Sequence, residues 1–341
     1  MIPVFHFGAS QRTRRPDARS AYRTHLRTAR EPGGVSRCAF RYPALLLWLL
    51  TALLPQAHSA TSFPTGKGLA QHDLFVGGED RDVHVIRGGK VEWSWRLTEK
   101  RGGVKDAALL STGDVLIAFQ YGALQVSPKK EIVWRYEAPE GFEVHTLGAI
   151  GPDRVWLIQN GALAKWMLFN KVSGAEEREF ILPTKGSVHT QTRRARLTPD
   201  GTLLVAHMDL GELREYDVEG KLVWSVKVEH PWGVARLPNR NTLAFDETHQ
   251  LAVEFTRGGE RVWEYDMNKP FEKRPGTQSI TTLPNGNLLL NVRFGPVQLV
   301  EVSRDKQIVW ALSDPRLGRC ACVQVLGSAS PVENVNFGPI R

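Results

Sequence analysis

The chain has 341 residues, with 44 basic and 36 acidic side chains and a formal net charge of +8. The excess is local, because nine arginines lie within residues 1–42 against two acidic residues, and the rest of the chain is almost neutral. A nucleic-acid-binding domain carries its basic residues on the folded body, so we expect no nucleic-acid partner. Three cysteines are too few for a disulfide framework.

The N-terminal region has the composition of a leader followed by an export signal. Residues 1–34 are rich in arginine and end in Pro-Gly-Gly, and we expect a disordered or untranslated leader. Residues 35–60 then combine two arginines, an apolar run at 44–54 and small residues at 57–60, which is the three-part pattern of a signal peptide. The sequence therefore predicts a periplasmic or secreted protein. A buried helix or membrane anchor is the alternative.

The apolar run at 44–54 also bears on membrane insertion. As a helix it would span about 16 Å, whereas the hydrocarbon core of a bilayer is about 30 Å thick. We therefore expect no stable membrane span.

A short strand signature that ends in Val-Trp recurs through the remaining chain, with residues 220–226 as its clearest copy. The intervals between successive copies are 39 to 47 residues, which is typical of the blades of a β-propeller. The aromatic positions of the six copies are Trp93, Trp134, Phe180, Trp224, Trp263 and Trp310.

The fourth copy shows the strand pattern best. Residues 194–197, 202–208, 213–217 and 221–226 have the β-branched and apolar character of strands, and a Thr-Pro-Asp-Gly turn at 198–201 separates the first two. We therefore expect four strands per blade.

The first repeat lacks an innermost strand, and the apolar segment 322–327 has no blade after it. Pairing the two would close the ring and remove its exposed edge. The sequence thus predicts an all-β fold, a six-bladed β-propeller of four-stranded blades closed by a C-terminal strand, with seven blades as the alternative. The expected divisions are a linker at 61–72, the propeller at 73–327 and a C-terminal tail at 328–341.

The recurring aromatic residue falls on the outermost strand of each blade. We interpret it as a structural wedge between neighbouring blades, because the outer strands lie far from the channel where ligands bind. Replacement of Trp224 by alanine should therefore act as a core lesion and cost about 3–5 kcal/mol.

The motif Asp217-x-x-Gly220-Lys221-x-x-Trp224 resembles the repeat of PQQ-type (quinoprotein-like) β-propellers. Blade residues 230–246 are similar to those of bacterial arylsulfotransferase-like propellers, which implies an exported six-bladed ring and a channel histidine that carries sulfate. The adjacent cysteines and calcium-binding acidic set of quinoprotein dehydrogenases are not evident in this sequence. We therefore predict no cofactor and consider PQQ unlikely.

A site is expected where the innermost strands begin and the second strands end, because these segments meet at one face of a propeller. The candidate ligand-binding residues there are Tyr121, His145, His189, Arg193, His230, Trp232, Asp246, Gln278 and Arg293. The spacing of the histidines indicates no metal site, and no catalytic set is recognisable.

These observations predict a monomeric exported propeller that binds a small molecule or an envelope protein at its central channel face. Two alternatives remain open. One is an arylsulfotransferase-like enzyme that uses a channel histidine, namely His145, His189 or His230. The other is an envelope assembly scaffold that binds partners through its loops.

Overall fold

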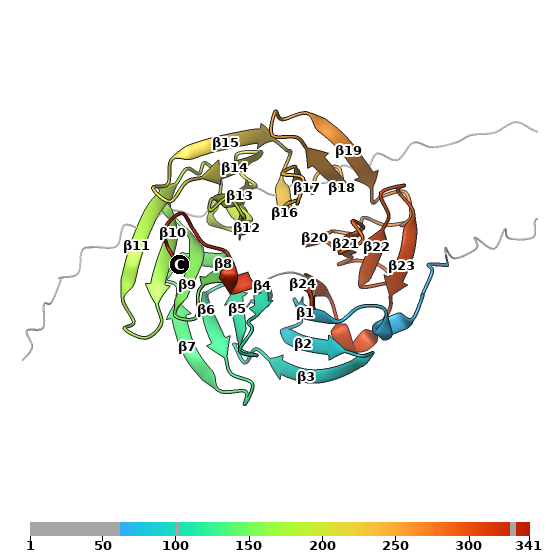
Figure 1. Cartoon of the computed structure of the whole chain (residues 1–341), viewed down its shortest axis with the longest axis horizontal. Helices are drawn as coiled ribbons and strands as arrows, with labels where there is room; N and C mark the ends of the chain where they lie inside the picture. The colour runs from blue at the N-terminus through green and yellow to red at the C-terminus, as the bar shows by residue number, and fades with distance from the viewer. Residues whose placement is uncertain (1–61, 100–101, 328–331) are drawn as a thin grey trace, which may run out of the picture. The chain divides into compact units, whose positions relative to one another are not determined.

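The structure is a computed structural model that describes residues 62–99, 102–327 and 332–341. The leader and signal-peptide predictions for residues 1–60 lie outside the described residues. Six four-stranded antiparallel sheets follow one another around a ring, which confirms the all-β six-bladed propeller (Figure 1).

The first three blades use the N-terminal half of the chain and one C-terminal strand. Blade 1 contains β24 (Cys320–Val325), β1 (Leu74–Gly78), β2 (Asp82–Arg87) and β3 (Lys90–Arg96). Blade 2 contains β4 (Val104–Leu109), β5 (Val115–Phe119), β6 (Gly122–Val126) and β7 (Ile132–Glu137). Blade 3 contains β8 (Glu143–Ile150), β9 (Arg154–Asn160), β10 (Ala164–Asn170) and β11 (Glu176–Leu182).

The other three blades follow in chain order. Blade 4 contains β12 (Thr192–Leu197), β13 (Leu203–His207), β14 (Glu212–Tyr216) and β15 (Leu222–Lys227). Blade 5 contains β16 (Pro231–Arg236), β17 (Thr242–Asp246), β18 (Leu251–Phe255) and β19 (Arg261–Asp266). Blade 6 contains β20 (Ile280–Thr282), β21 (Leu288–Asn291), β22 (Leu299–Val302) and β23 (Ile308–Leu312). Short 3₁₀ helices are η1 (Gly68–Ala70), η2 (Val188–Thr190), η3 (Pro315–Leu317) and η4 (Val332–Asn334).

The ring closes as the sequence predicts. Strand β24 pairs antiparallel with β1, so that Leu74 lies opposite Val325 and Val76 opposite Val323. The innermost strand of the first blade is therefore supplied by the C-terminus, and each described sheet has four strands. The seven-blade alternative is wrong.

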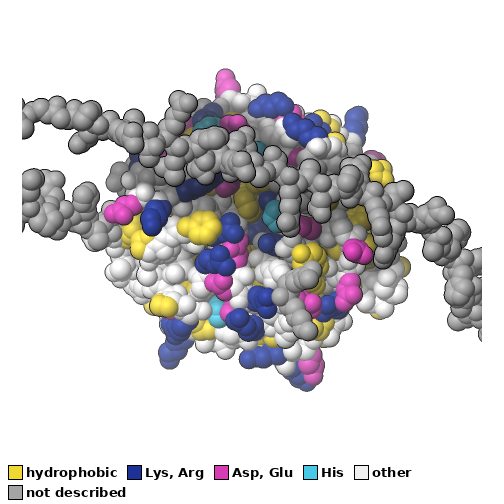
Figure 2. Space-filling model, turned by 180° about the vertical axis from the view of Figure 1, so that it is seen from behind, with side chains coloured by type: hydrophobic (Ala, Val, Ile, Leu, Met, Phe, Trp, Pro, Cys, Tyr) yellow, Lys and Arg dark blue, Asp and Glu magenta, His cyan; other side chains and the backbone are white. Residues whose placement is uncertain are grey.

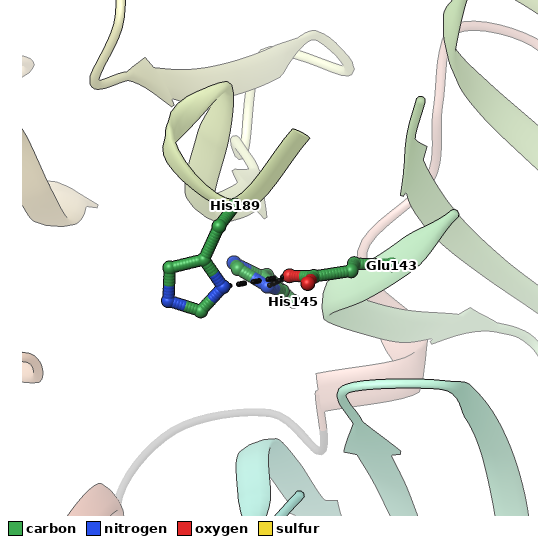
Figure 3. A group of neighbouring side chains, drawn as sticks. All are labelled: Glu143, His145 and His189. Carbon is green, nitrogen blue, oxygen red and sulfur yellow. Dashed lines mark hydrogen bonds and ion pairs between the residues drawn. The ribbon is translucent and has the colours of Figure 1, made fainter. Parts of the chain in front are cut away.

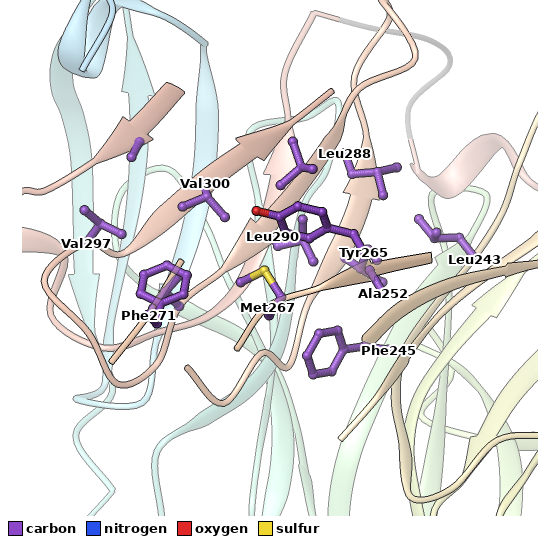
Figure 4. Close-up of a cluster of buried hydrophobic side chains, with 14 of the residues drawn as sticks. Leu243, Phe245, Ala252, Tyr265, Met267, Phe271, Leu288, Leu290, Val297 and Val300 are labelled. Carbon is purple, nitrogen blue, oxygen red and sulfur yellow. The ribbon is translucent and has the colours of Figure 1, made fainter. Parts of the chain in front are cut away.

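Each blade buries both of its faces, because successive side chains on a strand point to opposite sides. On β13, Leu203 and Val205 belong to a core shared with blade 3, whereas Leu204 and Ala206 belong to a core shared with blade 5. Figure 4 shows the equivalent cluster between blades 5 and 6, where Phe245 and Tyr265 pack toward Leu290. Continuous apolar runs on the middle strands follow from this double burial.

The recurring aromatic side chains touch the blade that follows their own. The indole N–H groups of Trp93, Trp224 and Trp263 donate to the carbonyl oxygens of Pro128, Arg257 and Arg304, at 2.9, 2.8 and 2.9 Å. Each acceptor lies in the turn between the third and fourth strands of the next blade.

These three indoles are only half-buried, whereas Trp310 is 1% exposed. The loss expected above for a fully buried Trp224 is therefore too large. Among the described residues, no helix has the length and apolar character needed to cross a membrane.

Replacing Trp224 should weaken the contact between blades 4 and 5. Trp224→Phe removes the hydrogen bond to Arg257 and should lower the free energy of unfolding by about 1 kcal/mol. Trp224→Ala also removes the half-buried ring and should cost about 2 kcal/mol. Urea denaturation measures both, with Val223→Ala, at an exposed neighbouring position, as the control. Equal midpoints for Trp224→Ala and the control would contradict the wedge.

Candidate functional site

A buried ion pair crosses the central channel. Asp106 on β4 and Arg194 on β12 are 1% and 2% exposed, and Arg194 Nη1 lies 2.6 Å from Asp106 Oδ1. Arg194 Nη2 donates to the carbonyl of Ala321 on β24 at 2.7 Å, and Arg196 Nη1 donates to Asp106 Oδ2 at 2.7 Å. These contacts tie blades 1, 2 and 4 together at the axis. The described channel has two pockets, one on each side of the pair, with no lining residue in common.

One of them, called here the polar pocket, lies where the innermost strands begin. It has a volume of about 70 Å³ and is lined by Glu79, Lys105, His145, His189, Arg193, Trp232, Gln278 and Arg293. Six of the nine residues proposed from the sequence are therefore brought together. In the view from behind, basic, acidic and histidine side chains are interspersed over the middle of the molecule (Figure 2).

The other three proposed residues lie outside the polar pocket. Tyr121 is 40% exposed. His230 is exposed as well, and its Nδ1 lies 3.0 Å from the hydroxyl of Thr248. Asp246 is buried and accepts hydrogen bonds from the backbone and ring nitrogens of His249. His230 and Asp246 therefore form contacts within their own loops.

One extra residue in each of several innermost strands turns a side chain into the channel. The pairing of β8 with β9 passes from Val144–Gln159 to Thr146–Ile158, so that His145 has no partner of its own. Lys105 is the extra residue of β4 in the same way, and β12 and β16 gain one residue near Arg193 and Trp232. Such β-bulges re-aim side chains. They build the polar pocket.

Glu143, His145 and His189 converge at the edge of this pocket (Figure 3). Glu143 Oε2 lies 2.7 Å from His145 Nε2 and 2.7 Å from His189 Nδ1, and Glu143 Oε1 accepts from the side-chain amide of Gln120 at 2.7 Å. Although burial opposes ionisation, these three hydrogen bonds hold the pKa of Glu143 far below its usual range. Glu143 is therefore a carboxylate.

The neighbours of His145 determine its protonation. Burial, reinforced by the charge of Arg193, lowers the pKa of His145 to about 3. Arg193 Nη1 lies 2.7 Å from His145 Nδ1, and a guanidinium can only donate. His145 Nδ1 is consequently the acceptor, and Nε2 carries the proton that binds Glu143. The imidazole is neutral at physiological pH.

Arg193 keeps its charge without touching a carboxylate. It is 5% exposed, it stacks at 4.3 Å on the ring of Trp232, and its Nε donates to the sulfur of Met208 at 3.3 Å. Burial lowers the pKa of Arg193 to about 10, so the guanidinium remains protonated at neutral pH. Its hydrogen-bond and stacking partners among the described residues are neutral, and Glu143 and Glu247 act on its charge only from a distance.

Lys105 is the second cation of the pocket, and burial lowers its pKa. No hydrogen-bond acceptor lies next to its ammonium group among the residues that the structure places. The third cation, Arg293, donates to Glu79 Oε2 at 2.7 Å. Three cationic side chains thus face two carboxylates, Glu79 and Glu143, and a small anion would balance the difference.

The sequence reasoning missed Glu79 and Glu143 as site residues. Glu143 lies two residues before His145 at the start of β8, and side chains two apart on a strand share a side. Glu79 follows the second strand of blade 1. Residues at the ends of second strands are expected at the site, and Arg293 was proposed on that ground.

The three converging side chains could also hold a metal, because one ligand atom from each lies within 4.8 Å of the others. Two histidines and one carboxylate are a known transition-metal set. However, the same atoms already bind one another, and Arg193 and Lys105 place positive charge beside them. The charges of the pocket favour an anion over a metal cation.

Comparisons with known proteins define the fold only. No family model matches the sequence, and neither does any curated protein. A protein of unknown function from Bacteroides caccae is 23% identical, with a TM-score of 0.64, over 73% of this chain and 97% of its own.

Two lyases also share the ring architecture. Virginiamycin B lyase from Staphylococcus aureus, a catalytically inactive histidine-to-alanine variant with quinupristin, is 14% identical, with a TM-score of 0.56, over 78% of this chain and 95% of its own. A streptogramin B lyase is 15% identical, with a TM-score of 0.56, over 76% of this chain and 85% of its own. The fold is therefore that of a β-propeller.

The neutral, buried His145 should make stability depend on pH. An exposed histidine has a pKa of about 6.5, so between pH 6.5 and 3 the unfolded chain binds a proton that the folded chain does not. The contribution of His145 to the free energy of unfolding is fully present above pH 6.5. It falls by about 1.4 kcal/mol per pH unit as the pH decreases toward 3.

Urea denaturation between pH 7 and pH 4 measures this slope. His145→Gln keeps an acceptor for Arg193 and should make this slope shallower by about 1.4 kcal/mol per pH unit. Lys129→Met, in an exposed turn, should leave it unchanged. A slope that is the same with and without His145 would show that this histidine is charged in the folded protein.

Proposed function

We propose that this protein is exported, as residues 35–60 predict, and binds a small anionic molecule in the polar pocket. The observation that carries the proposal is the pair of cations, Lys105 and Arg193, that no carboxylate of the described residues contacts directly. Burying a charge without a counter-ion is unfavourable. A bound anionic group would supply that counter-ion.

The size and chemistry of the pocket support a compact anionic group. A volume of about 70 Å³ suits a carboxylate, sulfate or phosphate rather than a whole drug-sized molecule. The guanidinium of Arg193 is held in place by Trp232 and His145, so little side-chain freedom is lost on binding. The rest of the ligand would extend past His189, which is half-exposed at the rim.

Isothermal titration with sulfate, phosphate and acetate tests this proposal. Lys105→Met should raise the dissociation constant at least about tenfold, since a charge-assisted bond contributes roughly 1.5–3 kcal/mol. The same variant should be as stable as the wild type or more so, because it removes a half-buried charge with no directly bound carboxylate among the described residues. Lys129→Met controls for net charge. Equal affinities for Lys105→Met and Lys129→Met would contradict the proposal.

A second candidate function is sulfuryl transfer through His189, in line with the motif resemblance to arylsulfotransferase-like propellers. The feature that favours it is the contact of His189 Nδ1 with the carboxylate of Glu143 at 2.7 Å, which leaves Nε2 free to attack. The S–O bond of an aryl sulfate would break and an S–N bond form, while the aryloxide leaves with the electron pair. An acceptor hydroxyl would then take the sulfuryl group and release its proton.

Incubation with 4-nitrophenyl sulfate and phenol as acceptor tests this second function. Release of 4-nitrophenolate, together with a protein adduct of sulfuryl mass on His189, is the expected result. His189→Asn should abolish both signals, whereas His230→Asn, outside the pocket, should retain them. Anion binding without turnover or adduct would be consistent with the binding function and would contradict the transferase function.

A further inference from the structure

The second pocket of the channel, called here the apolar pocket, lies on the other side of the Asp106–Arg194 pair. Its volume is about 360 Å³, which falls within the range of small-molecule sites. All six innermost strands contribute apolar side chains to its wall: Ala107, Ala108, Leu147, Ala149, Leu197, Val234, Ala235, Ile280, Val323 and Val325.

One cationic side chain at the base of this pocket has donors to spare. Arg196 Nη1 donates to Asp106 Oδ2 and to the carbonyl of Ala195, both at 2.7 Å, and Nη2 donates to Asp106 Oδ1 at 3.1 Å. A guanidinium has five N–H donors, so Nε and one hydrogen of Nη2 have no acceptor among the residues described. The side chain is 37% exposed, so a ligand can reach it.

The ionised side chains at the base carry one more positive charge than negative charges. Asp106 is the one carboxylate that serves both Arg194 and Arg196. Arg236 lines the same pocket, but its side chain is only 3% exposed, and it is bound to Glu215, which Arg257 also contacts, and to the hydroxyl of Thr242. Arg196 is therefore the group at the base that can bind an anion.

The C-terminal residues narrow the opening of the apolar pocket. Val332 and Val335 belong to its lining. Glu333 anchors this segment, because its Oε1 accepts from the backbone N–H of Ser111 at 2.7 Å and its carbonyl accepts from that of Gly151 at 2.8 Å. In Figure 1 the red helix η4 lies near the centre of the ring, beside β8. The pocket thus has apolar side chains from all six innermost strands, interspersed with Ser279, Thr281, Thr282 and Gln324, above a cationic base and below a partly covered mouth.

We propose that the apolar pocket binds an aliphatic monocarboxylate of medium chain length, with the carboxylate on Arg196 and the chain along the apolar walls. The match is one of charge and shape: among the described lining residues, Arg196 is the accessible cation with free donors, whereas Arg236 is only 3% exposed. An uncharged chain would leave the Arg196 donors unpaired, and a cation would meet the excess positive charge. This site is separate from the polar pocket and from the function proposed for it.

Isothermal titration with fatty carboxylates from hexanoate to dodecanoate tests the proposal, with decanol and decylammonium as probes of charge. Affinity should rise about fourfold for each methylene group until the apolar pocket is full. Decanoate should bind at least about tenfold more tightly than decanol, and decylammonium should not bind.

Variants distinguish this site from general hydrophobic binding. Arg196→Met should make decanoate and decanol bind equally, and Arg196→Lys should restore part of the preference. Arg196→Met leaves Asp106 and Arg194 as a one-to-one pair, so the fold should persist, which thermal unfolding checks. Ala108→Phe fills the apolar pocket and should abolish binding. Lys105→Met, in the polar pocket, should leave the gain in affinity per methylene group unchanged, because that gain comes from the apolar pocket.

Three results would overturn the proposal. They are equal binding of decanoate and decanol by the wild type, loss of decanoate binding in Lys105→Met, and unchanged binding in Ala108→Phe. Absence of decanoate binding to a folded wild-type protein would overturn it as well.

Discussion

The ion pair between Asp106 and Arg194 is the contact on which the interior of this propeller depends. A propeller buries its apolar side chains between blades, and the side chains of the innermost strands line the axis. Here Arg194 reaches from blade 4 to the carboxylate of blade 2 and to a backbone carbonyl of blade 1. Breaking a buried pair by removing one partner costs about 3–5 kcal/mol, so these two residues are held together in the folded state.

The two pockets follow from this contact. On β12, Arg193 faces the polar pocket, Arg194 lies at the axis, and Arg196 faces the apolar pocket. One strand therefore supplies a cation to each compartment and the barrier between them. The bulge in β12 makes this possible, because it places neighbouring arginine side chains where strict alternation would send one of them into a blade core.

The sequence predicted the ring and much of the polar pocket, because both follow from a repeat. The Val-Trp signature gives the phase of each blade, and the phase identifies the strand entries at which His145, His189 and Trp232 lie. The bulges were not predictable, since the inserted residue has no signature of its own. Glu143 acts through a contact with His189 of the next blade, and such pairing across blades is not visible in one sequence. The repeat predicted His230 at the site, but the conformation of its loop directs the side chain away from the polar pocket.

The central claim is that Lys105 and Arg193 bind an anion. The most direct measurement is the anomalous diffraction of crystals of this protein soaked with sodium selenate at neutral pH. The account predicts a selenium peak in the polar pocket, within hydrogen-bond distance of both cations, that is absent in Lys105→Met crystals. A pocket that stays empty, with Glu79 or Glu143 turned to bind Lys105, would contradict it.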